Sequence, residues 1–398
     1  MRYLTIGDSF TAIPVIGQGC GGGVIRDASD LERRAESLRH GIDCGLTLLD
    51  TAEAYHQGRS ETAVGLATKG RRDHVFIASK VSPEHLGRNE LIQAAEASLR
   101  RLQTDYIDLY QIHWSNRNIR IEETMDALGR LVSAGKVRHV GVCNFTAREL
   151  RAAEAAFAPR KIVSLQAEYN LFDRSVERSV LPSWSGPGRV FLAYSPLEQG
   201  SLAVGDEQRS RLEEIAVRYQ ATPAQVALAW IVSHPGVLAI PRSTGRAHIG
   251  ENAAAANLRL RPEDIRLIDE SFASQPESVA VDRIQVVTDG MDNRAVYKTV
   301  EEALANPLGL TPSPRELAAE ILDGEFLKPV RVRPARNPDG PHDFELIEGR
   351  LRYWAWVIAF NGRRAIDVLV RRDASRSSDG PAPSRPPLCS AETARAPA

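Results

Sequence analysis

The strongest constraint on the fold of this chain is a regular alternation of short apolar runs and longer amphipathic runs over about its first 272 residues. The short runs predict strands at residues 16–19, 46–50, 75–80, 106–113, 137–144, 162–166, 190–195 and 237–241. Between them, apolar residues recur at every third and fourth position, as on one face of a helix. Eight strands that alternate with helices predict a (β/α)8 barrel, which commonly takes about 250 residues.

A doubly wound open sheet is the alternative α/β architecture. Its dinucleotide-binding form opens the first helix with the pattern G-x-G-x-x-G, which this chain lacks at that place. We therefore favour the closed barrel, in which functional groups lie at the carboxyl ends of the strands.

Composition and charge exclude several classes of function. The net charge of −1 gives no overall attraction to nucleic acid or to anionic membranes. No run is long enough to span a bilayer, and the first residues do not resemble a signal peptide. The cysteines lack a C-x-x-C pair, which argues against a disulfide framework and a zinc site; they are Cys20, Cys44, Cys143 and Cys389. These features predict a cytoplasmic protein without a metal.

Polar residues end most of the predicted strands. They are Asp50, Lys80, His113, Asn144, Gln166 and Tyr194, with Tyr55 on the loop that follows Asp50. Taken singly, each has an ordinary explanation as a helix cap, a solvated strand end or a hydrogen-bonded core residue. Lys80 stands out because lysine occurs at only six positions, whereas arginine supplies most of the positive charge.

As a group, these side chains suit proton delivery to a carbonyl oxygen. A nearby Lys80 ammonium would lower the pKa of Tyr55 from the usual value of about 10, and Asp50 would keep the lysine charged. A neutral His113 would orient the reacting oxygen by a hydrogen bond. Asn144 and Gln166 would hold a nicotinamide carboxamide, and Tyr194 would stack on its ring.

The stretches LLDTAEAYHQGRSETAVG, IASK, DYIDLYQIHW, GKVRHVGVCNF, QAEYNLFDR and AYSPLEQG follow one another in this order. Over residues 1–272 this series resembles the aldo-keto reductase superfamily. The resemblance implies carbonyl reduction, or its reverse, with a catalytic tetrad in which Tyr55 is the general acid, and it assigns the tetrad to Asp50, Tyr55, Lys80 and His113. It also implies nicotinamide contacts by Cys143, Asn144, Gln166 and Tyr194, and further cofactor contacts by Ser195 and Leu197. Cys143 stands where the family usually has serine and donates only a weak hydrogen bond.

The stretch AIPRSTGRAHIGENAAA (239–255) resembles the family's clamp for the 2′-phosphate of NADP(H). Arg242 and Ser243 occupy the basic and hydroxyl positions, and Glu251 and Asn252 the adenine side. His248 stands where many members have an arginine. The resemblance therefore implies a preference for NADP(H), with NAD(H) as the second cofactor. Trp114 is expected to wall the substrate pocket, or alternatively to pack at the barrel rim.

A different pattern follows residue 272. We predict a linker over 273–280, a small α+β domain over 281–372 and a disordered Pro/Ser/Ala tail over 373–398. The predicted order is helix, strand, NPDG turn, strand, glycine, helix, NGRR turn and strand. This domain resembles the ParB and sulfiredoxin superfamily, whose G-E-R-R-x-R-A box appears here as GRLRYWA (349–355).

Three functions remain open for this fused domain. Gly349 and Arg352 would bind a phosphate, such as that of a nucleotide, at the start of a helix. A DNA-binding module is the second function, disfavoured because no helix-turn-helix follows. The third is a scaffold or lid packed on the barrel, with Trp354, Trp356 and Phe360 as core. The whole chain is then either an NADPH-dependent reductase with an appended domain or a reductase fold that serves as a binding or regulatory module.

Overall fold

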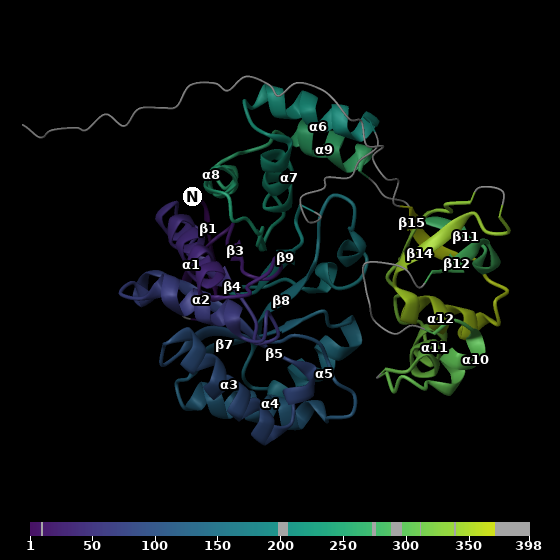
Figure 1. Ribbon diagram of the computed structural model, residues 1–398, viewed down its shortest axis with the longest axis horizontal. Helices are drawn as coiled ribbons and strands as arrows, with labels where there is room; N and C mark the ends of the chain where they lie inside the picture. Colours follow the sequence, from purple (N-terminus) through teal and green to yellow (C-terminus); the bar gives the residue numbers. More distant parts are fainter. Residues whose placement is uncertain are drawn as a thin grey trace, which may run out of the picture.

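The computed structural model describes residues 1–8, 11–197, 206–272, 276–287, 297–310, 312–337 and 340–370. Its larger sheet has eight parallel strands that are hydrogen-bonded in chain order and curl into a barrel (Figure 1). A parallel bridge between Ile16 and Ala239 joins the two ends of this sheet and closes it. The predicted barrel is confirmed, with strands β3 (Gln18–Gly19), β4 (Leu48–Asp50), β5 (Phe76–Val81), β6 (Ile107–Ile112), β7 (Val137–Cys143), β8 (Ile162–Glu168), β9 (Val190–Tyr194) and β10 (Val237–Ala239).

Helices surround the barrel (Figure 1). Two of them begin at a capping box, in which a threonine hydroxyl and the side chain three residues later satisfy free backbone N–H groups: Thr146 with Glu149, and Thr222 with Gln225. The helices are α1 (Ala28–Asp43), α2 (Arg59–Thr68), α3 (Arg88–Leu102), α4 (Ile121–Ser133), α5 (Ala147–Phe157), α6 (Asp206–Arg218), α7 (Pro223–Ile231), α8 (Arg246–Ala255) and α9 (Pro262–Ser271).

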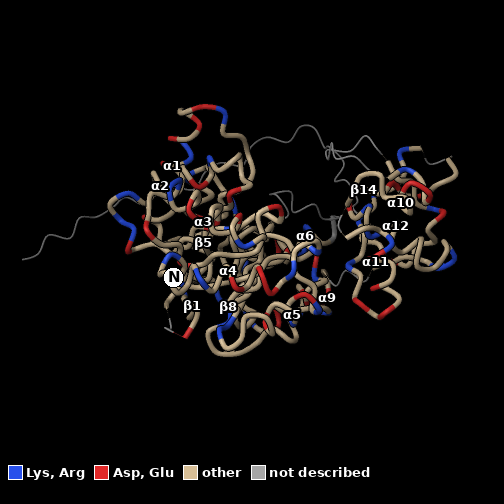
Figure 2. The backbone as a smooth tube through the Cα atoms, turned by 90° about the horizontal axis from the view of Figure 1, so that it is seen from below, with Lys and Arg blue, Asp and Glu red and all other residues tan. Residues whose placement is uncertain are grey.

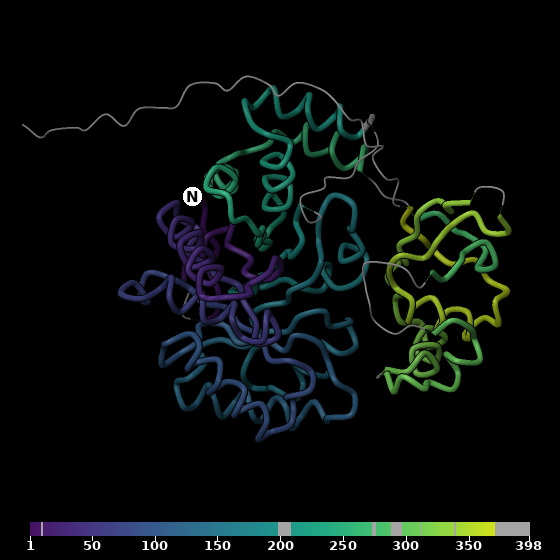
Figure 3. Tube along the Cα trace, viewed as in Figure 1, coloured from purple at the N-terminus to yellow at the C-terminus, as the bar shows by residue number. Residues whose placement is uncertain are grey.

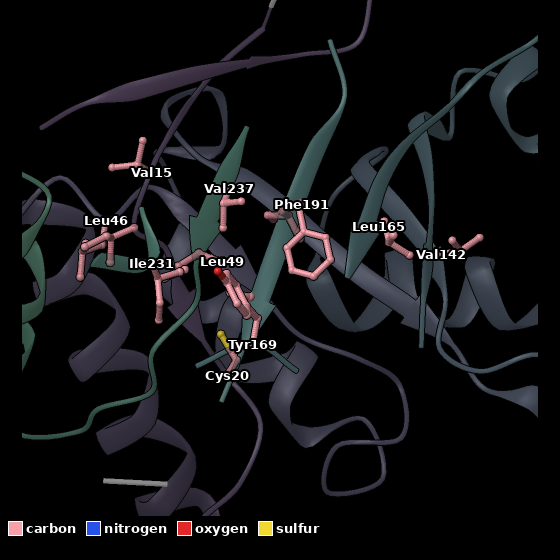
Figure 4. Close-up of a cluster of buried hydrophobic side chains, with 14 of the residues drawn as sticks. Val15, Cys20, Leu46, Leu49, Val142, Leu165, Tyr169, Phe191, Ile231 and Val237 are labelled. Atoms are coloured by element: carbon pink, nitrogen blue, oxygen red, sulfur yellow. The ribbon is translucent and has the colours of Figure 1, made fainter. Parts of the chain in front are cut away.

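The barrel strands are apolar on both faces because each face is buried. Successive side chains of a strand point to opposite sides. Leu49, Phe191 and Val237 belong to the large cluster shared with the helices (Figure 4), whereas their neighbours Leu48 and Leu238 belong to a second cluster inside the barrel. This two-sided burial explains the continuous apolar runs in the sequence.

An antiparallel hairpin, β1 (Tyr3–Ile6) and β2 (Thr11–Pro14), precedes the barrel and was not predicted from the sequence. Ile6 and Ile13 from its two strands join the apolar cluster inside the barrel. The Gly7 N–H also donates to the Gly188 carbonyl, 2.9 Å away, just before β9. The hairpin therefore closes the end of the barrel opposite the carboxyl ends of the strands.

The remaining described residues, 276–370, form what we call the C-terminal unit. Its five-stranded mixed sheet has the order β11–β15–β13–β14–β12, with α10 and α11 between β12 and β13 and α12 between β14 and β15. The bounds are β11 (Glu277–Val279), β12 (Ile284–Val286), α10 (Val300–Ala305), α11 (Pro314–Leu322), β13 (Val330–Pro334), β14 (Phe344–Glu348), α12 (Arg350–Phe360) and β15 (Ile366–Val370).

The element order predicted for this unit agrees with the structure from α11 to β15. The predicted linker over 273–280 needs correction, because Glu277–Val279 pairs antiparallel with β15 and forms an edge strand. The two central residues of the turn at NPDG and the predicted disordered tail over 373–398 lie outside the described residues. Of the three aromatic residues expected in the core, Trp354 is buried, whereas Trp356 and Phe360 are partly buried.

The C-terminal unit lies beside the loops that follow β6, β7 and β8, as the chain trace shows (Figure 3). Arg117, after β6, pairs with Glu320 of α11 at 2.6 Å. Glu168, at the end of β8, pairs with Lys328 at 2.9 Å. Positive and negative residues are interspersed over both parts of the chain (Figure 2). The C-terminal unit thus contacts the same end of the barrel where the predicted functional residues lie.

Close contact between α2 and α3 yields a test of the packing. A Cβ atom added at Gly65 would lie 2.7 Å from the Arg101 carbonyl oxygen and 2.8 Å from that of Leu102. Gly65→Ala should therefore force the two helices apart and cost about 1–3 kcal/mol of unfolding free energy. Urea denaturation followed by circular dichroism measures this loss.

Gly129→Ala is the matched control, since a Cβ atom at this position in α4 meets nothing closer than 3.5 Å. It should be neutral or stabilise the protein by roughly 0.5–1 kcal/mol, because alanine is the better helix former. Equal effects of the two substitutions would contradict the close packing at Gly65.

Candidate active site

A buried ion pair lies at the centre of the site. The Lys80 ammonium on β5 is 2.6 Å from a carboxylate oxygen of Asp50 at the end of β4, and neither side chain is more than 4% exposed. Lys80 also donates to the Thr51 carbonyl at 2.9 Å. Burial is the largest single influence and favours the neutral amine, but the charge and hydrogen bond of Asp50 together with the charges of Tyr55 and Cys143 outweigh it, and the net effect is a raised pKa of Lys80. Lys80 is therefore a fixed positive charge.

Tyr55 lies on the loop after β4, and its hydroxyl is 3.5 Å from the Lys80 ammonium. A tight turn holds this residue, since the next two residues, His56 and Gln57, have left-handed backbone angles. The sequence predicted a lowered pKa for Tyr55. The structure corrects this: burial raises its pKa, and the opposing effect of Lys80 is smaller. Tyr55 thus keeps its proton at neutral pH, which is the form that a general acid requires.

His113 follows β6 and faces Tyr55 edge to face, with ring centroids 5.5 Å apart. Its other neighbour is Trp114, whose ring stacks on it at 3.8 Å. Burial and the charge of Lys80 lower the pKa of His113 to about 3. The ring is therefore neutral near pH 7, as the sequence predicted, and its buried Nδ1 has no hydrogen-bond partner among the described residues.

The residues predicted to hold a nicotinamide ring lie next to this group and are linked to it. Gln166 donates to the second carboxylate oxygen of Asp50 at 2.8 Å and accepts a long contact of 3.6 Å from the Cys143 thiol. The Tyr194 hydroxyl donates to the Asn144 side chain at 2.9 Å. Burial raises the pKa of Cys143 to about 12, so its thiol is neutral. The structure therefore brings Cys143, Asn144, Gln166 and Tyr194 together.

A cavity of about 570 Å³ connects these residues. One side is formed by the glycines that follow β3, residues 21–23, which the sequence analysis overlooked although a glycine run directly after a predicted strand was visible. A Cβ atom at Gly21 would lie 3.0 Å from the Tyr55 ring, and one at Gly23 would lie 3.0 Å from the Arg242 guanidinium. The buried Arg34, also overlooked, donates to the Gly22 carbonyl at 2.9 Å and holds this loop.

The predicted phosphate clamp is only partly assembled around this cavity. Arg242 lines it, together with Ser195, Leu197 and Trp114. Ser243 hydrogen-bonds the nearby Gly245 carbonyl. The others lie in α8, where the His248 ring is 3.1 Å from the Glu251 carboxylate and Asn252 is buried. Among the described residues, Ser243, His248, Glu251 and Asn252 do not line the cavity.

Comparison with known proteins accounts for this geometry. The sequence profile of the Aldo/keto reductase family matches residues 17–273. Methylglyoxal reductase YeaE from Escherichia coli (strain K12) is 38% identical over 274 residues, which cover 69% of this chain and 96% of that protein. Aldo-keto reductase YhdN from Bacillus subtilis (strain 168) is 35% identical over 276 residues, 59% of this chain and 82% of that protein.

Solved structures agree. The thermostable aldo-keto reductase Tm1743, in complex with the inhibitor epalrestat, superposes with a TM-score of 0.64 at 39% identity, over 68% of this chain and all 100% of that one. An aldo/keto reductase from Klebsiella pneumoniae in complex with NADP and acetate gives a TM-score of 0.63 at 36% identity, over 68% and 96% of the two chains. The chain belongs to the aldo/keto reductase family. It is accordingly an NAD(P)H-dependent oxidoreductase of the aldo-keto reductase type.

The site of this reductase fits a nicotinamide cofactor on its own geometry. The cavity extends from Tyr55 and His113 to Arg242 and runs along glycines that leave no side chain in the way. At the end of the cavity near Tyr55, the buried Nδ1 of His113 has no hydrogen-bond partner among the described residues and so can accept or donate a bond to a bound molecule. Asn144 and Gln166 supply amide groups there. No cluster of three or more His, Cys, Asp or Glu suited to a metal ion occurs in the described part of the chain.

The family match ends at residue 273 and does not reach the C-terminal unit. The predicted phosphate site there is not supported by the structure, because Arg352 donates to the carbonyls of Lys328 at 2.8 Å and Pro329 at 2.9 Å. A Cβ atom at Gly349 would lie 2.9 Å from the same guanidinium. Arg352 therefore packs over Gly349 and fixes the backbone before β13.

The DNA-binding alternative is not supported either, because its basic residues largely have partners within the protein. Arg333 pairs with Glu345 at 2.6 Å, Arg331 with Glu168 at 2.7 Å, and Arg350 donates to the Val287 carbonyl at 3.2 Å. None of the helices that the structure describes has the length and apolar character needed to cross a membrane.

The low pKa of His113 yields a test through the pH dependence of stability. In the unfolded chain this imidazole binds a proton below about pH 6.5, whereas in the folded protein it does so only below about pH 3. Between these values the unfolded state binds more protons, so the unfolding free energy rises with pH across this window and falls on acidification. Urea unfolding at several pH values between 4 and 7 should show a shallower slope for His113→Gln than for the wild type. Identical slopes would mean that His113 takes up its proton over the same pH range in the folded and unfolded states.

Proposed function

We propose that this reductase converts a small aldehyde or ketone to the alcohol with NADPH, with Tyr55 as the proton donor. The observation that carries the proposal is the position of the protonated Tyr55 hydroxyl, 3.5 Å from a buried lysine, at one wall of the cavity. When bound, NADPH supplies the hydride that adds to the carbonyl carbon.

The chain's own residues then neutralise the negative charge that develops on the carbonyl oxygen. Tyr55 donates its proton to this oxygen, so that the product is a neutral alcohol and the phenolate remains. Lys80 lowers the free energy of that phenolate by its fixed charge, and Asp50 holds the ammonium in place. His113, which is neutral, donates a hydrogen bond that orients the oxygen before the transfer. The reverse steps oxidise the alcohol.

The substrate class follows from the relatives and from the cavity. One relative is named a methylglyoxal reductase, and Trp114 lines the cavity here while 47% exposed. The apolar indole ring can pack against the body of a carbonyl compound while its oxygen faces Tyr55. We therefore propose small α-oxoaldehydes, with methylglyoxal as the first compound to test.

Tyr55→Phe tests the proton donor. Without the hydroxyl, the rate constant kcat for methylglyoxal should fall about 10²- to 10⁴-fold, the usual contribution of a general acid. NADPH binding should stay nearly unchanged, because the ring remains. Loss of NADPH absorbance measures turnover, and quenching of protein fluorescence measures binding.

Tyr106→Phe is the matched control, because the Tyr106 hydroxyl donates to Asp73 at the surface, at 3.4 Å, and Tyr106 does not line the active-site cavity among the described residues. Unchanged turnover in Tyr55→Phe would exclude Tyr55 as the acid. If the wild type binds NADPH but reduces none of a panel of aldehydes and ketones, the chain would instead be a reductase fold used as a binding or regulatory module.

We also propose that Arg242 sets a preference for NADPH by pairing with its 2′-phosphate. Arg242→Gln should raise the dissociation constant for NADPH about 10- to 100-fold, as expected for the loss of a charge-assisted hydrogen bond, and should change that for NADH little. Arg246→Gln is the control, since Arg246 pairs with Glu36 on the surface at 2.8 Å. Equal binding of NADH and NADPH by the wild type would contradict this preference.

A further inference from the structure

In addition to the Arg117–Glu320 pair, four charged side chains join the C-terminal unit to the barrel. We call them the rim ion cluster: Glu168, Asp173, Lys328 and Arg331. Lys328 lies 2.9 Å from Glu168 and 2.7 Å from Asp173. Arg331 lies 2.7 Å from Glu168 and 3.0 Å from Asp173. Each cation thus bridges both carboxylates. The Arg331 side chain is only 12% exposed and that of Asp173 is 0% exposed, so water screens these pairs little.

The C-terminal unit holds its two cations firmly in place. Arg331, on β13, has a third partner in Glu348 on the neighbouring strand, at 2.8 Å. The backbone carbonyls of Lys328 and Pro329 accept hydrogen bonds from Arg352 on α12. The conformation of residues 328–331 is therefore fixed within the unit itself. This explains the role of Arg352 better than a phosphate site does.

The two acids belong to the segment that supports the nicotinamide end of the cavity. Glu168 is the register partner of Tyr194 in the barrel sheet. The N–H of Asp173 donates to the Asn170 side chain at 2.8 Å, which in turn donates to the Ser195 carbonyl at 3.1 Å. The acids are thus connected to Tyr194 and Ser195 by two separate routes, and both of these residues line the active-site cavity.

A second cavity, of about 420 Å³, shows how close the C-terminal unit comes to the active site. Asn144 and Tyr194 line it as well as the active-site cavity. Residues 324–326 and Lys328, from the C-terminal unit, line it too. Asn144 and Tyr194 therefore lie between this second cavity, which the C-terminal unit lines, and the space where a nicotinamide ring would bind.

Within the described part of the barrel, neither acid forms an ion pair; the cationic partners of both come from the C-terminal unit. Burial alone raises the pKa of Asp173, but Lys328 and Arg331 together bring it below the ordinary value. Without these cations, two adjacent carboxylates would be left at the rim, and the segment between residues 168 and 173 would have to rearrange to expose or protonate one of them. The rim of the barrel is thus complementary to the C-terminal unit.

We propose that Arg331 and Lys328 are positioning residues of the reductase site: by holding Glu168 and Asp173, they fix the Tyr194–Ser195 end of β9 against Asn144 and strengthen binding of the nicotinamide half of NADPH. The identity of the ligand rests on the proposed function. The C-terminal unit then supports one wall of the active site from outside the cavity. Among the three functions that the sequence left open for this domain, the proposal corresponds to the third, a scaffold or lid packed on the barrel.

The test compares two arginines of the same strand in the full chain. Arg331→Gln removes one of the two cations that bridge Glu168 and Asp173 of the barrel. Arg333→Gln is the matched control, because Arg333 lies two residues further along β13 and pairs only with Glu345 of the C-terminal unit among the residues described. Arg331→Lys restores the charge and should recover part of any loss.

Fluorescence titration with NADPH and with adenosine 2′,5′-bisphosphate, which lacks the nicotinamide half, provides the readout. Arg331→Gln should raise the dissociation constant for NADPH roughly 3- to 30-fold, the range for coupling through contacting residues, and leave that for adenosine 2′,5′-bisphosphate unchanged. Arg333→Gln should change neither. Melting temperatures of all variants show whether they remain folded, and Arg331→Lys keeps the test valid if Arg331→Gln does not fold.

Three results would overturn the proposal: an unchanged NADPH affinity in Arg331→Gln, an equal loss in Arg333→Gln, or an equal loss for adenosine 2′,5′-bisphosphate. The last two would indicate a general loss of stability. Failure of the proposed function is recognised separately, because a wild type that binds NADPH but reduces no carbonyl compound refutes the reaction and leaves these binding measurements valid. A wild type that does not bind NADPH would refute both.

Discussion

The buried pair of Lys80 and Asp50 is the interaction on which the rest of the site depends. Removing two charges from water is costly, and their attraction compensates only when further hydrogen bonds satisfy them. Here the Thr51 carbonyl and the Gln166 amide provide those bonds. The same amide contacts Cys143, and the same ammonium faces Tyr55. The charge pair therefore determines where the proton donor and the nicotinamide-binding amides lie relative to each other.

A second group of charges plays the corresponding role at the rim. Glu168 lies at the end of β8, and Asp173 lies on the loop after it. Their cationic partners come from outside the barrel: Lys328 and Arg331 are 160 and 163 residues later in the chain than Glu168. The barrel and the C-terminal unit are thus complementary in charge where they meet. In the role proposed above, the C-terminal unit acts on the reductase site through these contacts.

The strands of the barrel were predictable because their apolar runs are continuous and their ends are polar. Lys80 was found because it ends one of these strands and because it is a lysine in a chain that otherwise uses mostly arginine. Gly21, Gly22 and Gly23 were overlooked, although their signal was present, because a glycine run has no chemistry until the side chains that pack against it are known. The hairpin before β3 was also missed, since four-residue strands have little periodicity.

The sequence by itself determined the barrel, the order of its strands and the residue types at their carboxyl ends, because periodicity and strand-end polarity are local properties. Only the tertiary structure decided the electrostatics. The pKa of Tyr55 is raised rather than lowered because the extent of burial, which no local pattern reports, outweighs the charge of Lys80. Likewise, the sequence suggested Arg352 as a phosphate ligand, but in the fold its guanidinium donates to the backbone carbonyls of Lys328 and Pro329.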